Sequence, residues 1–373
     1  MKIQVNYRVV VLLLLLGGVG IHEILAELQP SFLRPGLHLF AYIGNTKDGT
    51  LTAIDLIKLS PSATVDVGAG PSGIRAHPTR KEIWGLSSAG GYVWILDVES
   101  NQVVARIPVG AEPYALDFSP DGERAYVAAS GSNTVVEIDC SSRRVIARAR
   151  TGRRPWIARV SPSGKLLIVS NRADGTVSLL DAQTLATMGV VGVVSKPERI
   201  VILPDDSKAF VTSGDTDQIS IVDLKQHVLL TNLALGGTPD DLILKPDGGE
   251  LYIPSSNTHG LIVVNTATDE VGDFVMLGSA PSGGTLTTDA QTLYISDTGA
   301  GRVIPITIDQ RRAAAPIPVG QAPGTCALTP GGDMLLAVDG TSNDVAVIRT
   351  QTSSLVTLIA VGSAPRDIAI KEF

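Results

Sequence analysis

Proline recurs along this chain at a fixed spacing of 42 residues, and this repeat constrains the fold more than any other feature. The first proline series comprises Pro71, Pro113, Pro155, Pro197, Pro239, Pro281, Pro323 and Pro365. A second series keeps the same step at Pro78, Pro120, Pro162, Pro204, Pro246 and Pro330, with Thr288 in its one vacant position. A third series comprises Asp55, Asp97, Asp139, Asp181, Asp223 and Asn265. A period of this length, combined with short β-type segments, predicts propeller blades of four strands each.

One repeat unit indicates where the four strands of a blade lie. Residues 124–129, 134–139 and 144–150 are short runs typical of strands, and residues 155–160 follow a Gly-Arg-Arg-Pro turn. The Ser-Pro-Ser-Gly sequence at 161–164 predicts a hairpin turn into the next unit. Equivalent units begin at Phe40, Glu82, Arg124, Leu166, Lys208, Glu250, Thr292 and Met334. We therefore predict an all-β protein that forms an eight-bladed propeller.

Short motifs recur within these units. Residues 42–45 read Tyr-Ile-Gly-Asn, residues 126–129 read Tyr-Val-Ala-Ala, and residues 119–122 read Ser-Pro-Asp-Gly. Val-x-x-Ile-Asp and Val-Gly-x-x-Pro segments lie between them. With these motifs, the region 38–373 resembles the YVTN-repeat β-propeller family, whose members have binding, surface-layer and enzymatic roles. The family usually has seven blades, and the eight units of this sequence depart from that pattern.

The resemblance also implies how the ring closes. In this family the strand that follows each proline of the first series is the innermost strand of its blade. The chain then begins on a second strand, residues 39–45, and ends on an innermost strand, residues 365–371. We expect these two strands to pair and to close the ring, because each blade is buried only against its neighbours.

The first residues of the chain are typical of an export signal. Lys2 and Arg8 precede an apolar run from Val9 to Val19, which is too short to span a bilayer as a helix. We expect residues 1–26 to be a signal peptide, or alternatively an uncleaved N-terminal anchor. Residues 27–38 would form a short linker and residues 39–373 a single propeller domain. The predicted location is the periplasm or the extracellular space, with possible tethering to the membrane.

Charge and cysteine content restrict the possible partners. The chain has 30 Lys and Arg against 37 Asp and Glu, a formal charge of −7, which disfavours nucleic acid as a partner. Its two cysteines, Cys140 and Cys326, fall on nearly opposite blades, too far apart for a disulfide. The scattered histidines do not indicate a metal site. We expect a monomer.

Polar and aromatic residues flank the periodic prolines unevenly. The loops at these prolines should surround one mouth of the central channel, where loops on a rigid scaffold can carry function. The candidate ligand-binding residues there are Glu112, Tyr114, Arg153, Arg154, Trp156, Lys196, Glu198, Arg199, Asp240, Asp241 and Arg366. Trp156 could stack against a flat or sugar-like ligand. The alternative is that these are solvated loop residues in compensating pairs such as Lys196–Glu198.

A second set of charges lies four residues after three consecutive prolines of the first series. Arg75, Asp117 and Arg159 occupy a position where the other five units have small or uncharged residues. Charges on an inner strand should be paired, because an unpaired buried ion is costly. We therefore predict an ionic tie between blades through these three residues, or alternatively an anion site in the channel.

Arginines also crowd one outer strand. Arg143, Arg144, Arg148 and Arg150 could dock an acidic partner or an anionic surface. The alternative is that charge on this edge strand prevents edge-to-edge aggregation.

These observations favour a non-catalytic propeller that binds a small molecule, glycan or protein at the channel mouth. The sequence contains none of the common nucleophile, phosphate-loop or metalloprotease motifs. No cofactor is predicted for this function. An alternative is a haem-dependent or redox-accessory propeller that resembles the nitrite reductase haem domain and its maturation proteins, with His38 or His77 as the axial ligand. A further alternative is a lactonase- or lyase-like enzyme.

Overall fold

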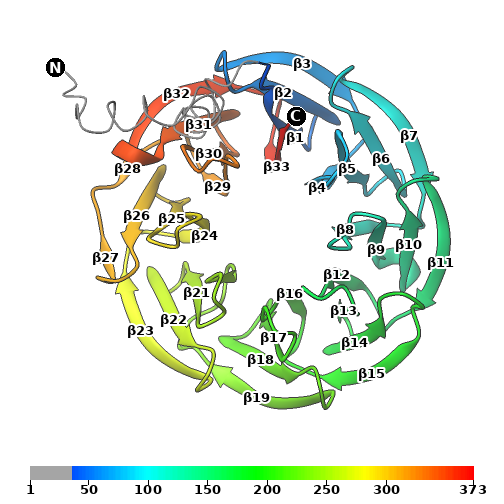
Figure 1. Ribbon diagram of the computed structural model, residues 1–373. Helices are drawn as coiled ribbons and strands as arrows, with labels where there is room; N and C mark the ends of the chain where they lie inside the picture. The colour runs from blue at the N-terminus through cyan, green and yellow to red at the C-terminus, as the bar shows by residue number, and fades with distance from the viewer. Residues whose placement is uncertain (1–35) are drawn as a thin grey trace, which may run out of the picture.

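Eight four-stranded antiparallel blades surround a central channel in the computed structural model, which describes residues 36–373 (Figure 1). The prediction of an eight-bladed all-β propeller is confirmed. The expected leader, residues 1–26, and all but the end of the expected linker lie outside the described residues. The described part of the chain contains no helix that is long and apolar enough to cross a membrane.

Blades 1 to 4 follow one another along the chain. Blade 1 comprises β1 (Leu39–Asn45), β2 (Thr50–Asp55), β3 (Ser60–Asp66) and the C-terminal β33 (Pro365–Glu372). Blade 2 comprises β4 (Pro71–Ala76), β5 (Glu82–Ser87), β6 (Tyr92–Asp97) and β7 (Gln102–Pro108). Blade 3 comprises β8 (Pro113–Phe118), β9 (Arg124–Ala129), β10 (Thr134–Asp139) and β11 (Arg144–Arg150). Blade 4 comprises β12 (Pro155–Val160), β13 (Leu166–Asn171), β14 (Thr176–Asp181) and β15 (Thr187–Gly192).

Blades 5 to 8 complete the ring. Blade 5 comprises β16 (Pro197–Ile202), β17 (Lys208–Ser213), β18 (Gln218–Asp223) and β19 (Val228–Ala234). Blade 6 comprises β20 (Ile243–Leu244), β21 (Glu250–Ser255), β22 (Gly260–Asn265) and β23 (Glu270–Met276). Blade 7 comprises β24 (Pro281–Leu286), β25 (Thr292–Asp297), β26 (Arg302–Thr307) and a fourth strand divided into β27 (Arg312–Ala313) and β28 (Ile317–Pro318). Blade 8 comprises β29 (Pro323–Leu328), β30 (Met334–Asp339), β31 (Asp344–Arg349) and β32 (Ser354–Ala360). Two short 3-10 helices lie in loops of blades 3 and 8, at Ser130–Ser132 and Thr350–Thr352.

The ring closes through the two ends of the described chain, as predicted. β33 pairs antiparallel with β1, so that Ile370 lies opposite Ala41 and Ile368 opposite Ile43. Beyond this ladder, the Phe373 amide donates to the His38 carbonyl at 2.9 Å. The strand that follows the last periodic proline is therefore the innermost strand of blade 1.

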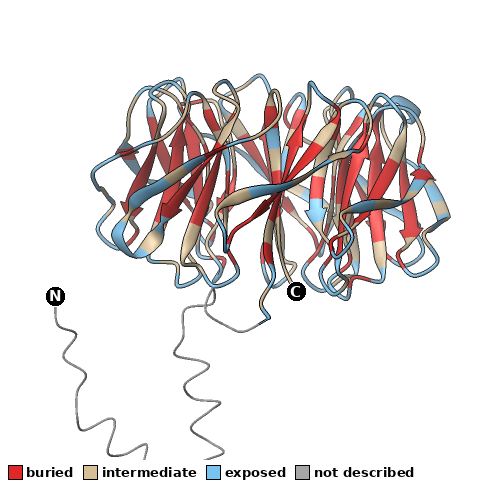
Figure 2. Cartoon of the chain, turned by 90° about the horizontal axis from the view of Figure 1, so that it is seen from above, coloured by how far each residue is buried: buried red, intermediate tan, exposed pale blue. Residues whose placement is uncertain are grey.

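Burial within each blade follows the strand order (Figure 2). Second strands such as β5 are buried along their whole length, because neighbouring blades cover both of their faces. The outermost strand β11 instead alternates between exposed and half-buried residues. The apolar core lies between blades, where for example Trp84 of blade 2 meets Phe118 of blade 3 edge-on, with ring centroids 5.5 Å apart.

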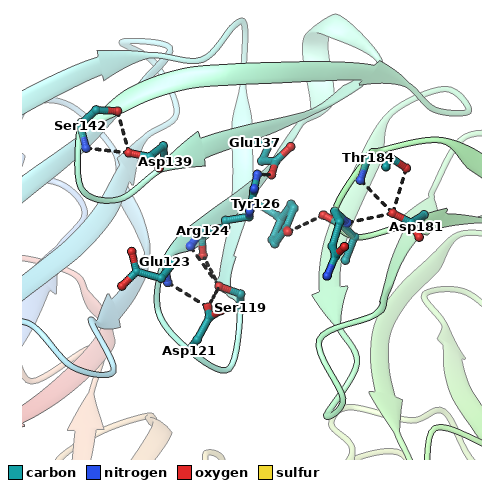
Figure 3. Close-up of polar contacts among 12 residues, drawn as sticks. Ser119, Asp121, Glu123, Arg124, Tyr126, Glu137, Asp139, Ser142, Asp181 and Thr184 are labelled. Atoms are coloured by element: carbon teal, nitrogen blue, oxygen red, sulfur yellow. Dashed lines mark hydrogen bonds and ion pairs between the residues drawn. The ribbon is translucent and has the colours of Figure 1, made fainter.

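The aspartates of the third sequence series hold the turns between the third and fourth strands (Figure 3). An Asp139 carboxylate oxygen accepts hydrogen bonds from the Ser142 amide and hydroxyl, both at 2.7 Å, and Asp181 accepts equivalent bonds from Thr184. The Ser142 amide is the largest influence that lowers the pKa of Asp139. These repeated carboxylates are therefore structural turn residues.

Candidate functional site

A cavity of about 750 Å³ lies at the mouth of the central channel, on the side where the innermost strands begin. Each innermost strand except β20 begins at a proline of the first series. The residue before the proline often has left-handed backbone geometry, with φ of 48° at Glu112, 52° at Arg154 and 44° at Lys196. This geometry is unusual for residues with side chains and separates the residue before the proline from the inner strand.

Six of the eleven candidates for the mouth line this cavity. They are Tyr114, Trp156, Glu198, Arg199, Asp241 and Arg366. Arg75, which was predicted to belong to the ionic tie, lines it as well. Blades 7 and 8 contribute small residues to the opposite wall: Ser282, Gly283, Gly284, Gly324 and Thr325.

The other five candidates do not line the cavity. Arg154 pairs with Glu112 at 3.2 Å, and Arg153 pairs with Asp174. Lys196 pairs with Asp215 at 3.1 Å, so the expected Lys196–Glu198 pair is not formed. Asp240 is held by the backbone of its own blade, because one of its carboxylate oxygens accepts a hydrogen bond from the Ser256 amide, 2.5 Å away. The three ion pairs have mostly exposed members, and such pairs contribute little to stability.

A stack of side chains forms one wall of the cavity. The rings of Tyr114 and Trp156 lie 3.4 Å apart between centroids, at an angle of 24°. The Arg172 guanidinium lies 4.5 Å from the Trp156 centroid, and because Tyr114 occupies one face of this ring, Arg172 must cover the other. Glu198 pairs with Arg172 at 2.7 Å and completes the stack. Burial raises the pKa of the Tyr114 hydroxyl.

Arg172 is the member of this stack that the sequence did not single out. It directly follows β13, in the loop between the second and third strands of blade 4. Its position in a loop beside the mouth was the available signal, but nothing in the repeat distinguished it from other loop residues. The stack also changes the expectation for Trp156. Both faces of the Trp156 ring are covered, so Tyr114 rather than Trp156 presents an open ring.

An ion pair between blades 5 and 6 lies beside this stack. Arg199 pairs with Asp241 at 3.3 Å, and its Nε donates to the Asp240 carbonyl at 3.0 Å. Burial raises the pKa of Asp241, and the Arg199 charge opposes this effect. The pair holds the Arg199 side chain in place at the edge of the cavity.

The three predicted members of the ionic tie behave differently from one another. Arg159 pairs with Asp117 at 3.4 Å across blades 4 and 3, and Asp117 also accepts a hydrogen bond from the Val160 amide at 3.0 Å. Arg75 forms no ion pair with Asp117, so the tie has two members rather than the three predicted. Desolvation by the surrounding blades lowers the pKa of Arg75, and the nearby Arg159 charge adds to this effect. Arg75 is left out of the tie because Arg159 and the Val160 amide, both of blade 4, already bind the Asp117 carboxylate.

The arginines predicted to form a docking surface also separate. Arg143 pairs with Glu82 of the neighbouring blade at 2.7 Å, so it joins two blades. Arg148 donates to the Val109 carbonyl at 2.6 Å. Arg144 and Arg150 lie at exposed positions of β11. Docking of an acidic partner or an anionic surface through these four arginines stays a prediction.

The histidines considered as axial ligands lie away from the cavity. His77 is 1% exposed, its Nδ1 accepts hydrogen bonds from two following backbone amides, and its ring packs 4.8 Å from Phe118. His38 stacks on Phe373 with centroids 5.2 Å apart. Neither histidine lines the mouth cavity. Within residues 36–373, no group of three or more His, Cys, Asp or Glu side chains could hold a metal ion.

Cys326 is a buried thiol in the cavity wall. Its sulfur lies 3.0 Å from the Ser296 hydroxyl, and burial raises its pKa to about 12. Cys140 is also a free, buried thiol, in the core between blades 2 and 3. The thiolate form is scarce at neutral pH for a cysteine in such a setting, so Cys326 is a poor nucleophile.

Comparisons with known proteins relate the chain to other propellers. Dihydro-haem d1 dehydrogenase NirN, solved in complex with DHE, superposes with a TM-score of 0.77 at 14% identity, over 88% of this chain and 74% of that protein. Hydrazine synthase of Kuenenia stuttgartiensis superposes with a TM-score of 0.61 at 20% identity, over 75% and 95% of the two chains. A functionally unknown protein of Desulfotomaculum acetoxidans DSM 771 superposes with a TM-score of 0.61 at 14% identity, over 76% and 97%. At these identities the likeness shows a shared fold.

A search of curated proteins found no match. The comparison with protein families, in contrast, matches residues 125–370 to the YNCE-like beta-propeller description. This region covers more than half of the chain and includes all of blades 4 to 8. The protein therefore belongs to the YNCE-like beta-propeller family.

Proposed function

We propose that this protein is an exported, non-catalytic propeller that binds a small molecule in the mouth cavity. The observation that carries the proposal is the uneven cavity wall. Blades 1 to 5 present arginines and the Tyr114–Trp156 stack, whereas blades 7 and 8 present small residues. Aromatic and arginine side chains are favoured in binding hot spots, and a volume of about 750 Å³ is within the range of small-molecule sites.

The lining residues support binding rather than catalysis. Arg199 and Asp241 are held by their mutual ion pair, and Glu198 is held by Arg172. The raised pKa of Cys326, about 12, argues against nucleophilic catalysis by its thiol. The groups that face the cavity are therefore positioned to recognise charge and shape.

The export part of the proposal rests on the sequence from Lys2 to Ala26. Fractionation of cells that produce the full chain, with N-terminal sequencing of the recovered protein, tests it. Recovery of the protein beyond the cytoplasmic membrane is the expected result. Recovery of the full-length protein from the cytoplasm would contradict export without affecting the proposed binding site.

Tryptophan fluorescence provides a direct test of binding at the mouth. Trp84 and Trp94 are 0% exposed, whereas Trp156 lies in the cavity wall. Small molecules released by denaturing the natively purified protein are identified by mass spectrometry and added back to the ligand-free protein. We expect the fluorescence of the wild type to change and that of Trp156→Phe to remain constant. An equal change in both proteins would place binding elsewhere and contradict the proposal.

A haem-type ligand is a second candidate, because NirN was solved in complex with DHE and has the same fold. Among residues 36–373, no histidine lines the mouth cavity, and His38 and His77 both lie away from it, so the described residues do not fit haem held there by a histidine. An optical spectrum of the natively purified protein distinguishes the two candidates. A Soret band would favour a tetrapyrrole, and a spectrum without one would favour a colourless small molecule.

A further inference from the structure

We infer that the ligand of the mouth cavity is a flat, conjugated ring system that carries two carboxylate groups. This inference rests on the proposed binding function and specifies the chemistry of the ligand. Two independent features of the cavity support it: an open aromatic ring at the end of a stack, and two arginines in the wall that lack carboxylate partners.

The first feature is the order of the stack. Glu198 holds Arg172, Arg172 covers one face of Trp156, and Tyr114 covers the other face. Within residues 36–373, Tyr114 makes no ring or cation contact apart from the one with Trp156. Tyr114 lines the cavity, and 37% of the residue is exposed. A flat ring placed on Tyr114 would extend the stack, and stacked aromatic pairs are favourable beyond the apolar area that they bury.

The second feature is the charge left over in the wall. Arg199 is paired with Asp241, and Arg172 is paired with Glu198. Arg75 and Arg366 also line or border the same cavity, but neither has an ion-pair partner in the described part of the chain. The Arg75 guanidinium donates a long hydrogen bond to the Ile74 carbonyl, at 3.5 Å.

Neither of the two carboxylates close to these arginines forms an ion pair with them. Asp367 accepts a hydrogen bond from the Gly73 amide at 2.7 Å, and Asp117 is bound by Arg159. Both attract Arg75 electrostatically from beyond ion-pair distance, while Arg159 repels it. A guanidinium binds a carboxylate through two parallel hydrogen bonds, which is the strongest pairing open to it. Two such free groups in one cavity match a ligand with two acid groups.

The opposite wall leaves room for a ring system. At the repeat position that holds Tyr114 in blade 3 and Trp156 in blade 4, blade 7 has Ser282 and blade 8 has Gly324. A side-chain carbon added at Gly324 would lie 3.9 Å from its nearest neighbour, the Val338 carbonyl, so there is space at this position, whereas one added at Gly284 would clash with the Tyr294 carbonyl. The small residues therefore keep open the space that faces the stack.

The test uses naphthalene dicarboxylate as the probe and isothermal titration calorimetry on the ligand-free protein. Three matched compounds separate the contributions: naphthalene monocarboxylate has one charge, cyclohexane dicarboxylate is not flat, and the dimethyl ester of the probe is uncharged. We expect the flat dicarboxylate to bind at least about tenfold more tightly than each of the three. Arg75→Gln, Arg366→Gln and Tyr114→Leu should each weaken its binding by about tenfold.

Arg150→Gln is the control variant, because it makes the same change at an exposed position of β11. It should bind the probe like the wild type, and thermal melting should show that all variants remain folded. Equal affinity for the probe and its uncharged ester, or binding that the three cavity variants leave unchanged, would overturn the inferred ligand class. If an unrelated small molecule still changes the Trp156 fluorescence, the proposed function survives that failure. If neither the probe nor a released molecule affects Trp156, both fail.

Discussion

Asp339 lies beside a second carboxylate, Asp344, and the titration of Asp339 should make the stability of the fold depend on pH. They lie directly opposite each other on β30 and β31, and Asp339 is 0% exposed. One buried oxygen of each carboxylate lacks a hydrogen-bond donor in the described structure, and the Gly320 amide donates to the other oxygen of Asp339. The equivalent position opposite Asp297 in blade 7 is Arg302, which pairs with it at 2.8 Å.

The pKa of Asp339 is raised from 3.8 to about 8, first by burial and then by the neighbouring Asp344 carboxylate, which favours the protonated form of Asp339 and repels its charge. Since each pKa unit corresponds to 1.36 kcal/mol, a shift of about 4 units represents up to roughly 5 kcal/mol. The folded state binds this proton more tightly than the unfolded state. The stabilising contribution is therefore complete below about pH 4 and is lost as the pH rises through about 8.

The Asp344→Asn variant tests this reasoning. The amide removes the like charge and can donate a hydrogen bond to Asp339, so the pKa of Asp339 should fall. We expect the free energy of unfolding to rise by about 1–3 kcal/mol at pH 8 and to change little at pH 5. Urea denaturation at both pH values measures the effect, with Asp309→Asn as an exposed control. If the two variants and the wild type lose the same stability between pH 5 and pH 8, the carboxylate pair does not act as described.

Three further predictions concern the ring and its buried groups. Deletion of residues 365–373 should lower the free energy of unfolding by more than about 5 kcal/mol in urea denaturation, because it opens the ring; an unchanged midpoint would show that closure is not needed. Asp117→Ala should cost about 1–3 kcal/mol because it leaves the partly buried Arg159 and the Val160 amide without their acceptor, whereas Arg75→Ala should cost less than about 1 kcal/mol; similar melting temperatures for both would argue against this distinction. Cys140 and Cys326, whose pKa values burial raises to about 12, should react with a thiol reagent at pH 8 only after unfolding, and rapid labelling of the native protein would contradict their burial.

The positions of the predicted strands follow directly from local sequence. Residues 124–129, 134–139, 144–150 and 155–160 form β9, β10, β11 and β12 as predicted. Turn residues and alternating or continuous apolar runs favour strands and turns within a few positions of the chain. The strands can therefore be predicted without knowing which residues pack against them in the folded protein. The number of blades followed from counting such units.

The candidate site was predictable in composition but not in arrangement. Glu112, Arg154 and Lys196 were expected at the cavity because they precede the periodic prolines. Their backbones are left-handed, and their side chains form ion pairs outside the cavity. Arg172 entered the site although no repeat position marked it. The partners of these side chains lie 19, 26 or 42 residues away in the chain, and only tertiary packing, within one blade or between adjacent blades, selects among them.

The sequence therefore determined the all-β class and the eight blades, because a 42-residue period repeats the same strand and turn residues in each blade. The closure of the ring followed from the strand order that the resemblance to the YVTN-repeat family implies. Only the tertiary structure decided that Tyr114 is the open ring of the stack and that Arg75 lacks the partner expected for it. These features depend on contacts between side chains from different blades. Their geometry exists only after the ring has closed.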